Sequence, residues 1–104
     1  MIRDITSLED FHTLIAANKV SIIDFSAAWC GPCKFVAPKF EELSEQYSQK
    51  IFAKVDIDEV PDAAQEAGIR AMPTFCVFQD GQKIGELVGA NPSKLEALCK
   101  KYLR

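Results

Sequence analysis

The sequence predicts an α/β protein in which helices cover both faces of a central mixed sheet. Strand-like and helix-like patterns alternate along the 104 residues, as in layered α/β folds. The run VSIIDFSAA at 20–28 is almost entirely apolar, as expected of a strand buried on both faces. QDGQ at 79–82 contains an Asp-Gly step, which favours a hairpin turn. Helix-connected strands followed by a hairpin require parallel and antiparallel pairs in one sheet.

The elements follow one another as five strands and four helices. In chain order we expect strands and helices at 1–6 (strand), 7–18 (helix), 20–28 (strand), 32–48 (helix), 50–58 (strand), 60–68 (helix), 73–78 and 83–88 (strands), and 91–104 (helix). The first helix has a capping pattern, Thr6 followed three residues later by Glu9. Leu8, Phe11 and Ile15 then fall at the spacing of one buried helix face.

The later helices carry their own start, stop and break signals. Pro38 lies inside the second helix and is expected to interrupt and bend it, because proline has no N–H to donate. Gly68 should end the third helix. Asn91 or Ser93 should cap the last helix, which places Leu95, Leu98, Cys99 and Tyr102 on one face.

Composition excludes several classes of protein. Hydrophobic residues make up 48% and charged residues 26% of the chain, as in folded soluble domains. The net charge of −3 argues against a nucleic-acid surface, which needs clustered Lys and Arg. No apolar run approaches the roughly 18 residues of a membrane span. The start, MIRDITSLED, lacks a secretory signal, so we expect an intracellular protein. The length of 104 residues predicts a single domain over residues 1–104.

The pair of cysteines in SAAWCGPCKFVAP (26–38) carries the chemistry. A structural zinc site needs four ligands, and only His12, Cys76 and Cys99 are available besides Cys30 and Cys33, so zinc is disfavoured. Haem attachment needs His directly after the second cysteine, where Lys34 stands. A fixed staple is unusual in a reducing compartment. The position of the two cysteines in a turn at the start of a helix argues against an inert pair of core cysteines.

Reversible disulfide exchange fits the pair best. Gly31-Pro32 places the cysteines at a helix start, where backbone N–H groups and the helix dipole stabilise a thiolate on Cys30. Three residues apart on a first helical turn, Cys30 and Cys33 share a face and can close a small ring.

The set of motifs along the whole chain resembles the thioredoxin family, in its single-domain eukaryotic, fungal-like form. WCGPC at 29–33 follows an apolar strand that carries Asp24. It is followed, in the order and approximate spacing of that family, by KVDID at 54–58, MPTF at 72–75, DGQ at 80–82 and VGA at 88–90. CxxC alone would be a weak signal, whereas the full set is specific. The resemblance implies a thioredoxin fold, with a five-stranded mixed sheet and four helices in three layers.

The resemblance also implies roles for individual residues. Cys30 would attack a substrate disulfide and Cys33 would resolve the mixed disulfide, leaving a Cys30–Cys33 disulfide. Asp24, whose charge would be costly to bury, would exchange the proton of Cys33, and Lys54 would tune that acid. The implied docking residues, with Pro73 in cis, are Trp29, Gly31, Pro32, Met72, Pro73, Gly89 and Ala90. Gly81 fits the family's hairpin turn.

The implied activity is that of a general protein disulfide reductase that maintains cell redox homeostasis. No bound cofactor or metal is implied, since electrons would come from NADPH through the flavoprotein thioredoxin reductase. Further partners would be disulfide-bearing proteins such as peroxiredoxins, methionine sulfoxide reductases or ribonucleotide reductase. We expect no nucleic-acid or membrane partner, a monomer, and a location in the cytoplasm, with the nucleus as an alternative.

Two other functions stay open at this stage. An oxidase or isomerase would run the same chemistry in the opposite direction, although such proteins often have His between the cysteines, where this chain has Gly31-Pro32. A scaffold subunit would use the fold without the thiols. We expect Cys76 and Cys99 to be core residues and His12 to lie at or near the surface.

Overall fold

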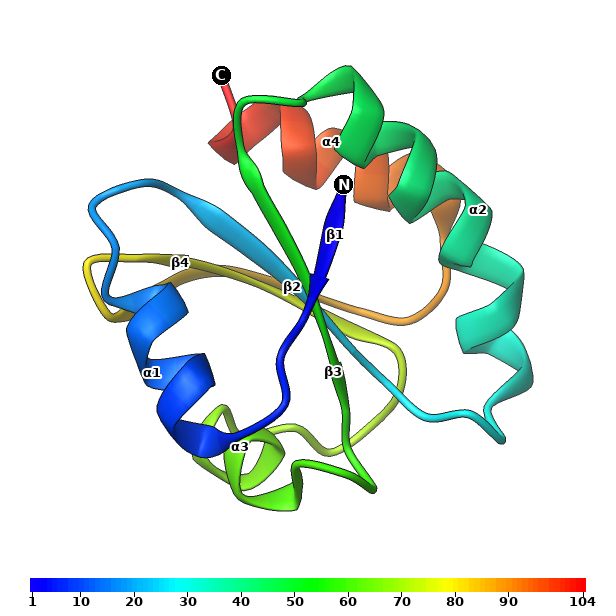
Figure 1. Ribbon diagram of the computed structural model, residues 1–104. Helices are drawn as coiled ribbons and strands as arrows, with labels where there is room; N and C mark the ends of the chain where they lie inside the picture. Colours follow the sequence, from blue (N-terminus) through cyan, green and yellow to red (C-terminus); the bar gives the residue numbers. More distant parts are fainter.

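Five strands form one mixed sheet in the computed structural model, which describes residues 1–104 (Figure 1). The strand order is β1-β3-β2-β4-β5, with β2 at the centre. β1 and β2 pair with β3 in parallel, whereas β2–β4 and β4–β5 are antiparallel. The strands are β1 (Ile2–Asp4), β2 (Ser21–Ser26), β3 (Ile51–Asp56), β4 (Thr74–Gln79) and β5 (Gln82–Val88). The predicted five-stranded mixed sheet is confirmed.

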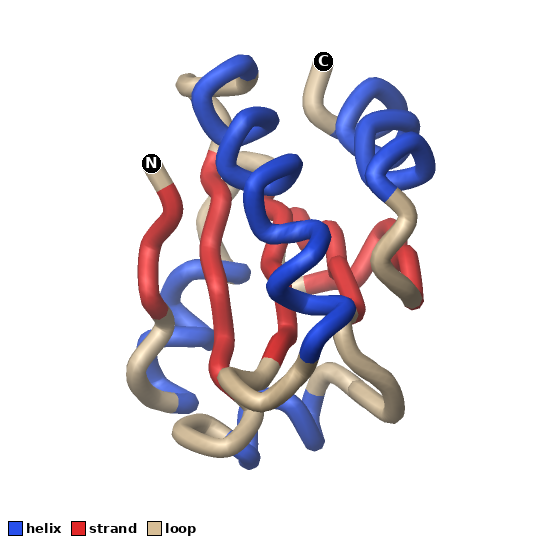
Figure 2. The backbone as a smooth tube through the Cα atoms, turned by 90° about the vertical axis from the view of Figure 1, so that its right-hand side faces the viewer, coloured by secondary structure: helices blue, strands red, loops and turns tan.

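Four helices cover the sheet, two on each face. They are α1 (Leu8–Ile15), α2 (Gly31–Gln46), α3 (Pro61–Glu66) and α4 (Pro92–Tyr102). α2 and α4 pack together on one face, and α1 and α3 on the other, which gives the three predicted layers (Figures 1 and 2). None of these helices is long and apolar enough to span a bilayer.

The central strand β2 is buried along its whole length because helices cover both of its faces. Its side chains alternate between two cores. Ile22 joins the core under α2 and α4, whereas Ile23 and Phe25 join the core under α1 and α3. Phe40 of α2 lies 5.4 Å, between ring centroids, from Phe75 of β4 in the first core. The apolar run at 20–28 thus contributes side chains to both cores.

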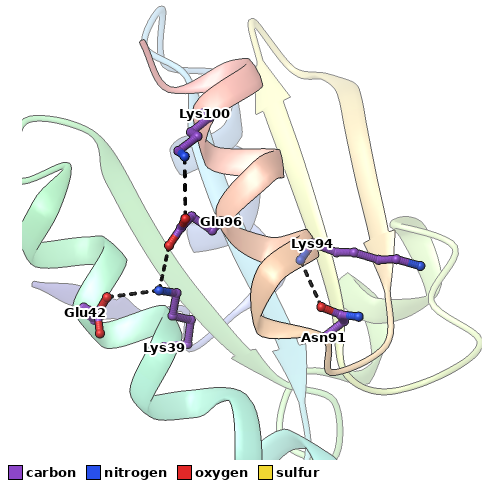
Figure 3. A network of polar contacts seen from close by, with 6 residues as sticks. All are labelled: Lys39, Glu42, Asn91, Lys94, Glu96 and Lys100. Atoms are coloured by element: carbon purple, nitrogen blue, oxygen red, sulfur yellow. Dashed lines mark hydrogen bonds and ion pairs between the residues drawn. The ribbon is translucent and has the colours of Figure 1, made fainter.

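Asparagine and serine side chains cap two of the helices. Ser7 caps α1, since its side chain accepts a hydrogen bond from the N–H of Asp10, and Asp10 in turn accepts one from the N–H of Thr6. The expected pair of Thr6 and Glu9 is therefore wrong: Ser7 is the cap, and the Asp10 side chain accepts from the N–H of the residue before the cap and not from that of Ser7. Asn91 caps α4 by accepting from the N–H of Lys94 at 3.0 Å (Figure 3).

α2 runs without a break from Gly31 to Gln46 and contains Pro38 in its interior. The expected interruption at Pro38 is wrong, since the missing N–H removes one hydrogen bond but the buried side chains of Val36 and Phe40 hold the helix against the sheet on both sides of it. The turns on either side of the proline therefore stay helical.

An ion-pair network joins the outer sides of α2 and α4 (Figure 3). Nζ of Lys39 lies 2.8 Å from Glu96 and 3.1 Å from Glu42, and Lys100 lies 3.6 Å from Glu96. Hydrogen bonds to both carboxylates raise the pKa of Lys39, and the lysines lower the pKa of Glu96. The network thus links α2, the helix that begins at the cysteines, to α4.

The β4–β5 hairpin turns at Asp80 and Gly81, which both have positive φ (53° and 80°), as the Asp-Gly signal predicts. The pairing then shifts register between Val77 and Phe78, which locally disturbs the ladder opposite β5. Just past this irregularity the ring of Tyr102 lies over Gly85, so that a Cβ on Gly85 would come 2.6 Å from a ring carbon. Only glycine leaves room for the ring there.

We expect Gly85→Ala to lower the free energy of unfolding by about 1–3 kcal/mol, because the added methyl group displaces the Tyr102 ring. Urea unfolding of the single variant and of the same change in a Tyr102→Ala background measures this coupling. In the second background Gly85→Ala should be neutral or stabilising, because alanine suits a strand better than glycine does. An equal loss in both backgrounds would contradict the explanation.

Candidate active site

Cys30 and Cys33 form a disulfide at the start of α2, as expected from the sequence. Their Cα atoms lie 5.3 Å apart, and each residue is only 5% exposed. Cys30 is the N-cap of the helix, and its sulfur accepts a hydrogen bond from the N–H of Cys33 at 3.2 Å. An N–H group and a helix N-terminus directed at one sulfur stabilise negative charge there. The geometry therefore suits Cys30 as the thiolate of the pair.

Asp24 lies in the middle of β2 and is 2% exposed. Its Oδ1 has no hydrogen-bond partner. Burial raises the pKa of Asp24 from 3.8 to about 6, and the positive charge of Lys54 partly offsets this rise. Asp24 and Lys54 are register partners on the neighbouring strands β2 and β3. The structure thus brings these two predicted residues together.

A cavity of about 410 Å³ lies between Cys33 and Lys54. Its lining includes Cys33, Lys34, Lys54 and Asp56, together with small residues of β2, α2 and the segment between them. Cys33, in the first turn of α2, and Lys54 of β3 therefore line one partly polar cavity.

Trp29, directly before the pair, is 66% exposed, yet its ring is held in place. Its Nε1–H donates a hydrogen bond of 2.8 Å to Oδ2 of Asp58, in the connection between β3 and α3. The N–H of Asp58 donates in turn to Asp56, which fixes this connection. Asp58 belongs to the KVDID motif at 54–58, but the sequence did not point to it, because nothing in the spacing of the motif shows which carboxylate reaches the indole.

The Met72–Pro73 bond is cis, as the resemblance implies. Met72 packs against Cys30 and Cys33, and neither backbone polar group of Met72 has a partner within the protein. The carbonyl of Pro73 accepts a hydrogen bond from the N–H of Gly89 at 2.9 Å, where Gly89 has φ of 109°. This bond brings the end of β5 to the cysteines.

The remaining predicted docking residues divide into two kinds. Gly31 and Pro32 are exposed at the first turn of α2, beside the sulfur atoms. Ala90 is partly buried and packs on the core under α2 and α4, so it contributes as much to that core as to a surface. The sequence did not distinguish these two situations.

The other two cysteines are free, buried and far from this chemistry, as expected. Cys76 belongs to the core under α1 and α3, and Cys99 to the core on the opposite face of the sheet. Burial raises the pKa of each thiol to about 12. They remain thiols at neutral pH and are poor nucleophiles.

His12 lies at the surface, where its Nε2 is 2.5 Å from Oε2 of Glu66. The exposed pair links α1 to α3, on the face of the sheet away from α2. No group of three or more His, Cys, Asp or Glu side chains is placed to hold a metal ion.

Comparison with known proteins yields one family. The family model described as Thioredoxin matches residues 3–101. A thioredoxin of Coprinus comatus is 53% identical over 105 residues, which cover 99% of each chain. The crystal structure of Malassezia sympodialis thioredoxin (Mala s 13) superposes with a TM-score of 0.96 at 47% identity, covering 100% of this chain and 92% of that one.

A further structural neighbour comes from a study of the thiol-resolving mechanism in yeast mitochondrial 1-Cys peroxiredoxin via glutathione/thioredoxin systems. It is 45% identical with a TM-score of 0.91, and the alignment covers 96% of this chain and 94% of that one.

The raised pKa of Asp24 predicts how stability depends on pH. Between about pH 4 and 6 the folded state holds a proton on Asp24 that the unfolded chain releases, so stability falls as pH rises through this window and levels off above it. The shift corresponds to about 3 kcal/mol at pH 7. We therefore expect Asp24→Asn to stabilise the oxidised protein by up to about 3 kcal/mol at pH 7.5 and hardly at all near pH 4.

Urea unfolding at the two pH values measures this difference. Glu45→Gln, which neutralises an exposed carboxylate of α2, is the control and should change stability by less than about 0.5 kcal/mol. A gain for Asp24→Asn that is equal at both pH values would show that Asp24 is not the titrating group.

Proposed function

The chain belongs to the thioredoxin family, and we propose that it is a general reductant of protein disulfides that NADPH-dependent thioredoxin reductase recharges. Its activity is dithiol–disulfide exchange through Cys30 and Cys33, which makes it a protein disulfide oxidoreductase. One observation carries the proposal. The disulfide lies at the N-terminus of α2, and the Cys30 sulfur accepts a hydrogen bond from the backbone N–H of Cys33. Beyond this exchange activity, we propose that electrons flow from this protein to substrate disulfides and that thioredoxin reductase recharges it.

In the proposed reaction, the Cys30 thiolate attacks one sulfur of the substrate disulfide. The substrate S–S bond breaks, a mixed disulfide with Cys30 forms, and the leaving sulfur takes up a proton. Cys33 then loses its proton and attacks the Cys30 sulfur. The second substrate sulfur leaves as a thiolate and takes up a proton, and the Cys30–Cys33 disulfide forms. Counting the proton that Cys30 releases when it becomes a thiolate, the substrate gains two electrons and two protons and the cysteine pair loses them.

Asp24 is proposed to accept the proton of Cys33, and Lys54 to set how readily it does so. A pKa of about 6 lies close to neutral pH, where a carboxylate can take up a proton and return it. Lys54 lowers the pKa of Asp24 and lines the cavity that reaches Cys33. Both features support a relay beneath the disulfide.

The substrate is proposed to bind as an extended segment across Trp29, Met72 and the small residues beside them. The unpaired backbone groups of Met72 can hydrogen-bond to an extended chain, which gives recognition with little side-chain specificity. Gly31, Pro32 and Gly89 have no long side chains, so the substrate backbone can come close to the sulfur atoms. Ala90 continues this surface towards α4.

Peroxiredoxins are the substrate class with the most direct support, because a close structural neighbour comes from a study of peroxiredoxin resolution. Methionine sulfoxide reductases and ribonucleotide reductase are proposed on family grounds, as are a cytoplasmic location, the absence of a bound cofactor and a monomeric state. All five strands belong to one sheet, which supports our proposal that residues 1–104 work as one domain.

The midpoint potential of the Cys30–Cys33 couple tests the direction of electron flow. We expect about −270 mV, a value typical of thioredoxins, after equilibration in thiol–disulfide buffers with the oxidised fraction read by alkylation. With NADPH and a purified thioredoxin reductase, the wild type should then sustain NADPH oxidation, whereas the Cys30→Ser/Cys33→Ser variant should not. A potential of about −180 to −120 mV would instead make this protein an isomerase or an oxidant.

The proposed relay predicts a change in the pH dependence of exchange. The rate at which the reduced protein reduces a peptide disulfide should rise between about pH 5 and 8, and Asp24→Asn should lower the rate and flatten most of that dependence. Lys54→Gln should move the inflection to higher pH, because Lys54 lowers the pKa of Asp24. Stopped-flow measurement of the reduction rate across this pH range tests the relay. An unchanged pH profile in Asp24→Asn would rule out Asp24 as the proton acceptor.

A further inference from the structure

Phe35 is a large apolar side chain that the reaction above does not use. It lies two residues after Cys33 in α2 and is 68% exposed. The other exposed large apolar residues are Met1, Trp29, Ile84 and Val88. A single exposed apolar residue is ordinary on a protein surface. What sets Phe35 apart is its position one helical turn after Gly31 and Pro32, the exposed residues between the two cysteines.

Helical periodicity places Phe35 on the flank of α2 that faces α4. Residues four apart lie one turn from each other on the same side of a helix, so Phe35 shares a side with Lys39. Lys39 contacts Glu96 of α4 (Figure 3). Phe35 therefore lies one turn nearer the disulfide on the same flank. Its exposure shows that α4, which begins at Pro92, does not cover it.

The opposite side of the cysteine pair carries the other exposed aromatic residue. Trp29 is held by Asp58 in the connection that leads to α3, which lies on the other face of the sheet from α2 and α4. Along the chain the cysteine pair is thus flanked by one aromatic ring tied towards α3 and one on α2, in the opposite helical layer.

The surroundings of Phe35 favour an apolar partner. Lys39, one helical turn further along that flank, is already paired with Glu42 and Glu96. Phe35 follows Gly31 by four residues and Pro32 by three, so it lies one turn along the same exposed side of α2 as these two residues. A substrate segment that covers Gly31 and Pro32 therefore comes within reach of the Phe35 ring. Burying an aliphatic side chain against an aromatic ring is favourable.

We propose that Phe35 is a specificity-determining residue, which contacts an apolar side chain next to the attacked disulfide of a protein substrate. This inference rests on the proposed disulfide reductase function and adds a preference to it. Substrates with Leu, Met or Phe near the cysteine gain a contact on the α4 side of the site. Small disulfides without flanking residues gain nothing from it.

A set of symmetric peptide disulfides tests the preference. Each is a disulfide of two identical seven-residue peptides with one central cysteine in a Ser background, and Leu is placed in turn at the two positions before and the two after that cysteine. The second-order rate constant for reduction by the reduced protein is measured from the released peptide thiol. We expect the wild type to reduce at least one Leu peptide about fivefold faster than the all-Ser peptide, a difference of about 1 kcal/mol.

Phe35→Ser should reduce that advantage to less than about twofold and leave the rate on the all-Ser peptide unchanged. Phe35→Leu should keep most of the advantage. Ile84→Ser, which removes another exposed apolar side chain from β5, is the control and should keep all of it. An equal midpoint potential for each variant shows that the disulfide site is intact.

Two outcomes would overturn the role of Phe35: a wild type with no preference for Leu at any position, or a Phe35→Ser variant that keeps the preference. Either would leave the proposed reductase function standing, since the all-Ser peptide would still be reduced. Failure of the wild type to reduce any peptide would overturn the proposed function together with this inference.

Discussion

β2 is buried on both faces, between two neighbouring strands and under two pairs of helices, and this burial governs which side chains it can carry. A strand between two neighbouring strands and two helical layers has no exposed side chain, so its residues must be apolar or, like Asp24, tolerate removal from water. The same strand ends at Ser26, and the chain leaves the sheet there to begin α2 at the cysteines. One buried strand therefore sets both the acid beneath the site and the position of the disulfide above it.

The reacting site forms where several segments meet at one end of the sheet. The start of α2 brings the cysteines, the connection after β3 brings Asp58 to Trp29, and the segment before β4 brings Met72 against the sulfur atoms. The hydrogen bond between Gly89 and Pro73 adds the end of β5. Backbone groups and small residues make up much of this surface, which suits substrates that share a disulfide and little else.

Burial also separates the four cysteines into two chemical kinds. Cys30 and Cys33 lie at a helix N-terminus beside a polar cavity, where a thiolate can be stabilised and a proton can move. Cys76 and Cys99 are buried in the cores on opposite faces of the sheet, and that burial, with the carboxylate of Glu86 beside Cys76, keeps their thiols protonated. The same side chain is reactive or inert according to what surrounds it.

The fold class, the order of the elements, the hairpin turn, the disulfide and the pairing of Lys54 with Asp24 could be predicted from the chain, because each rests on local pattern, spacing or a specific set of motifs. Local signals also misled: Thr6 and Glu9 match a capping box, but the cap is Ser7, and Pro38 does not break α2 because packing on both sides holds the helix. That Asp58 holds Trp29 and that α4 leaves Phe35 uncovered emerged only from the folded chain. These are contacts between segments far apart in the chain, and their distances depend on how the layers pack.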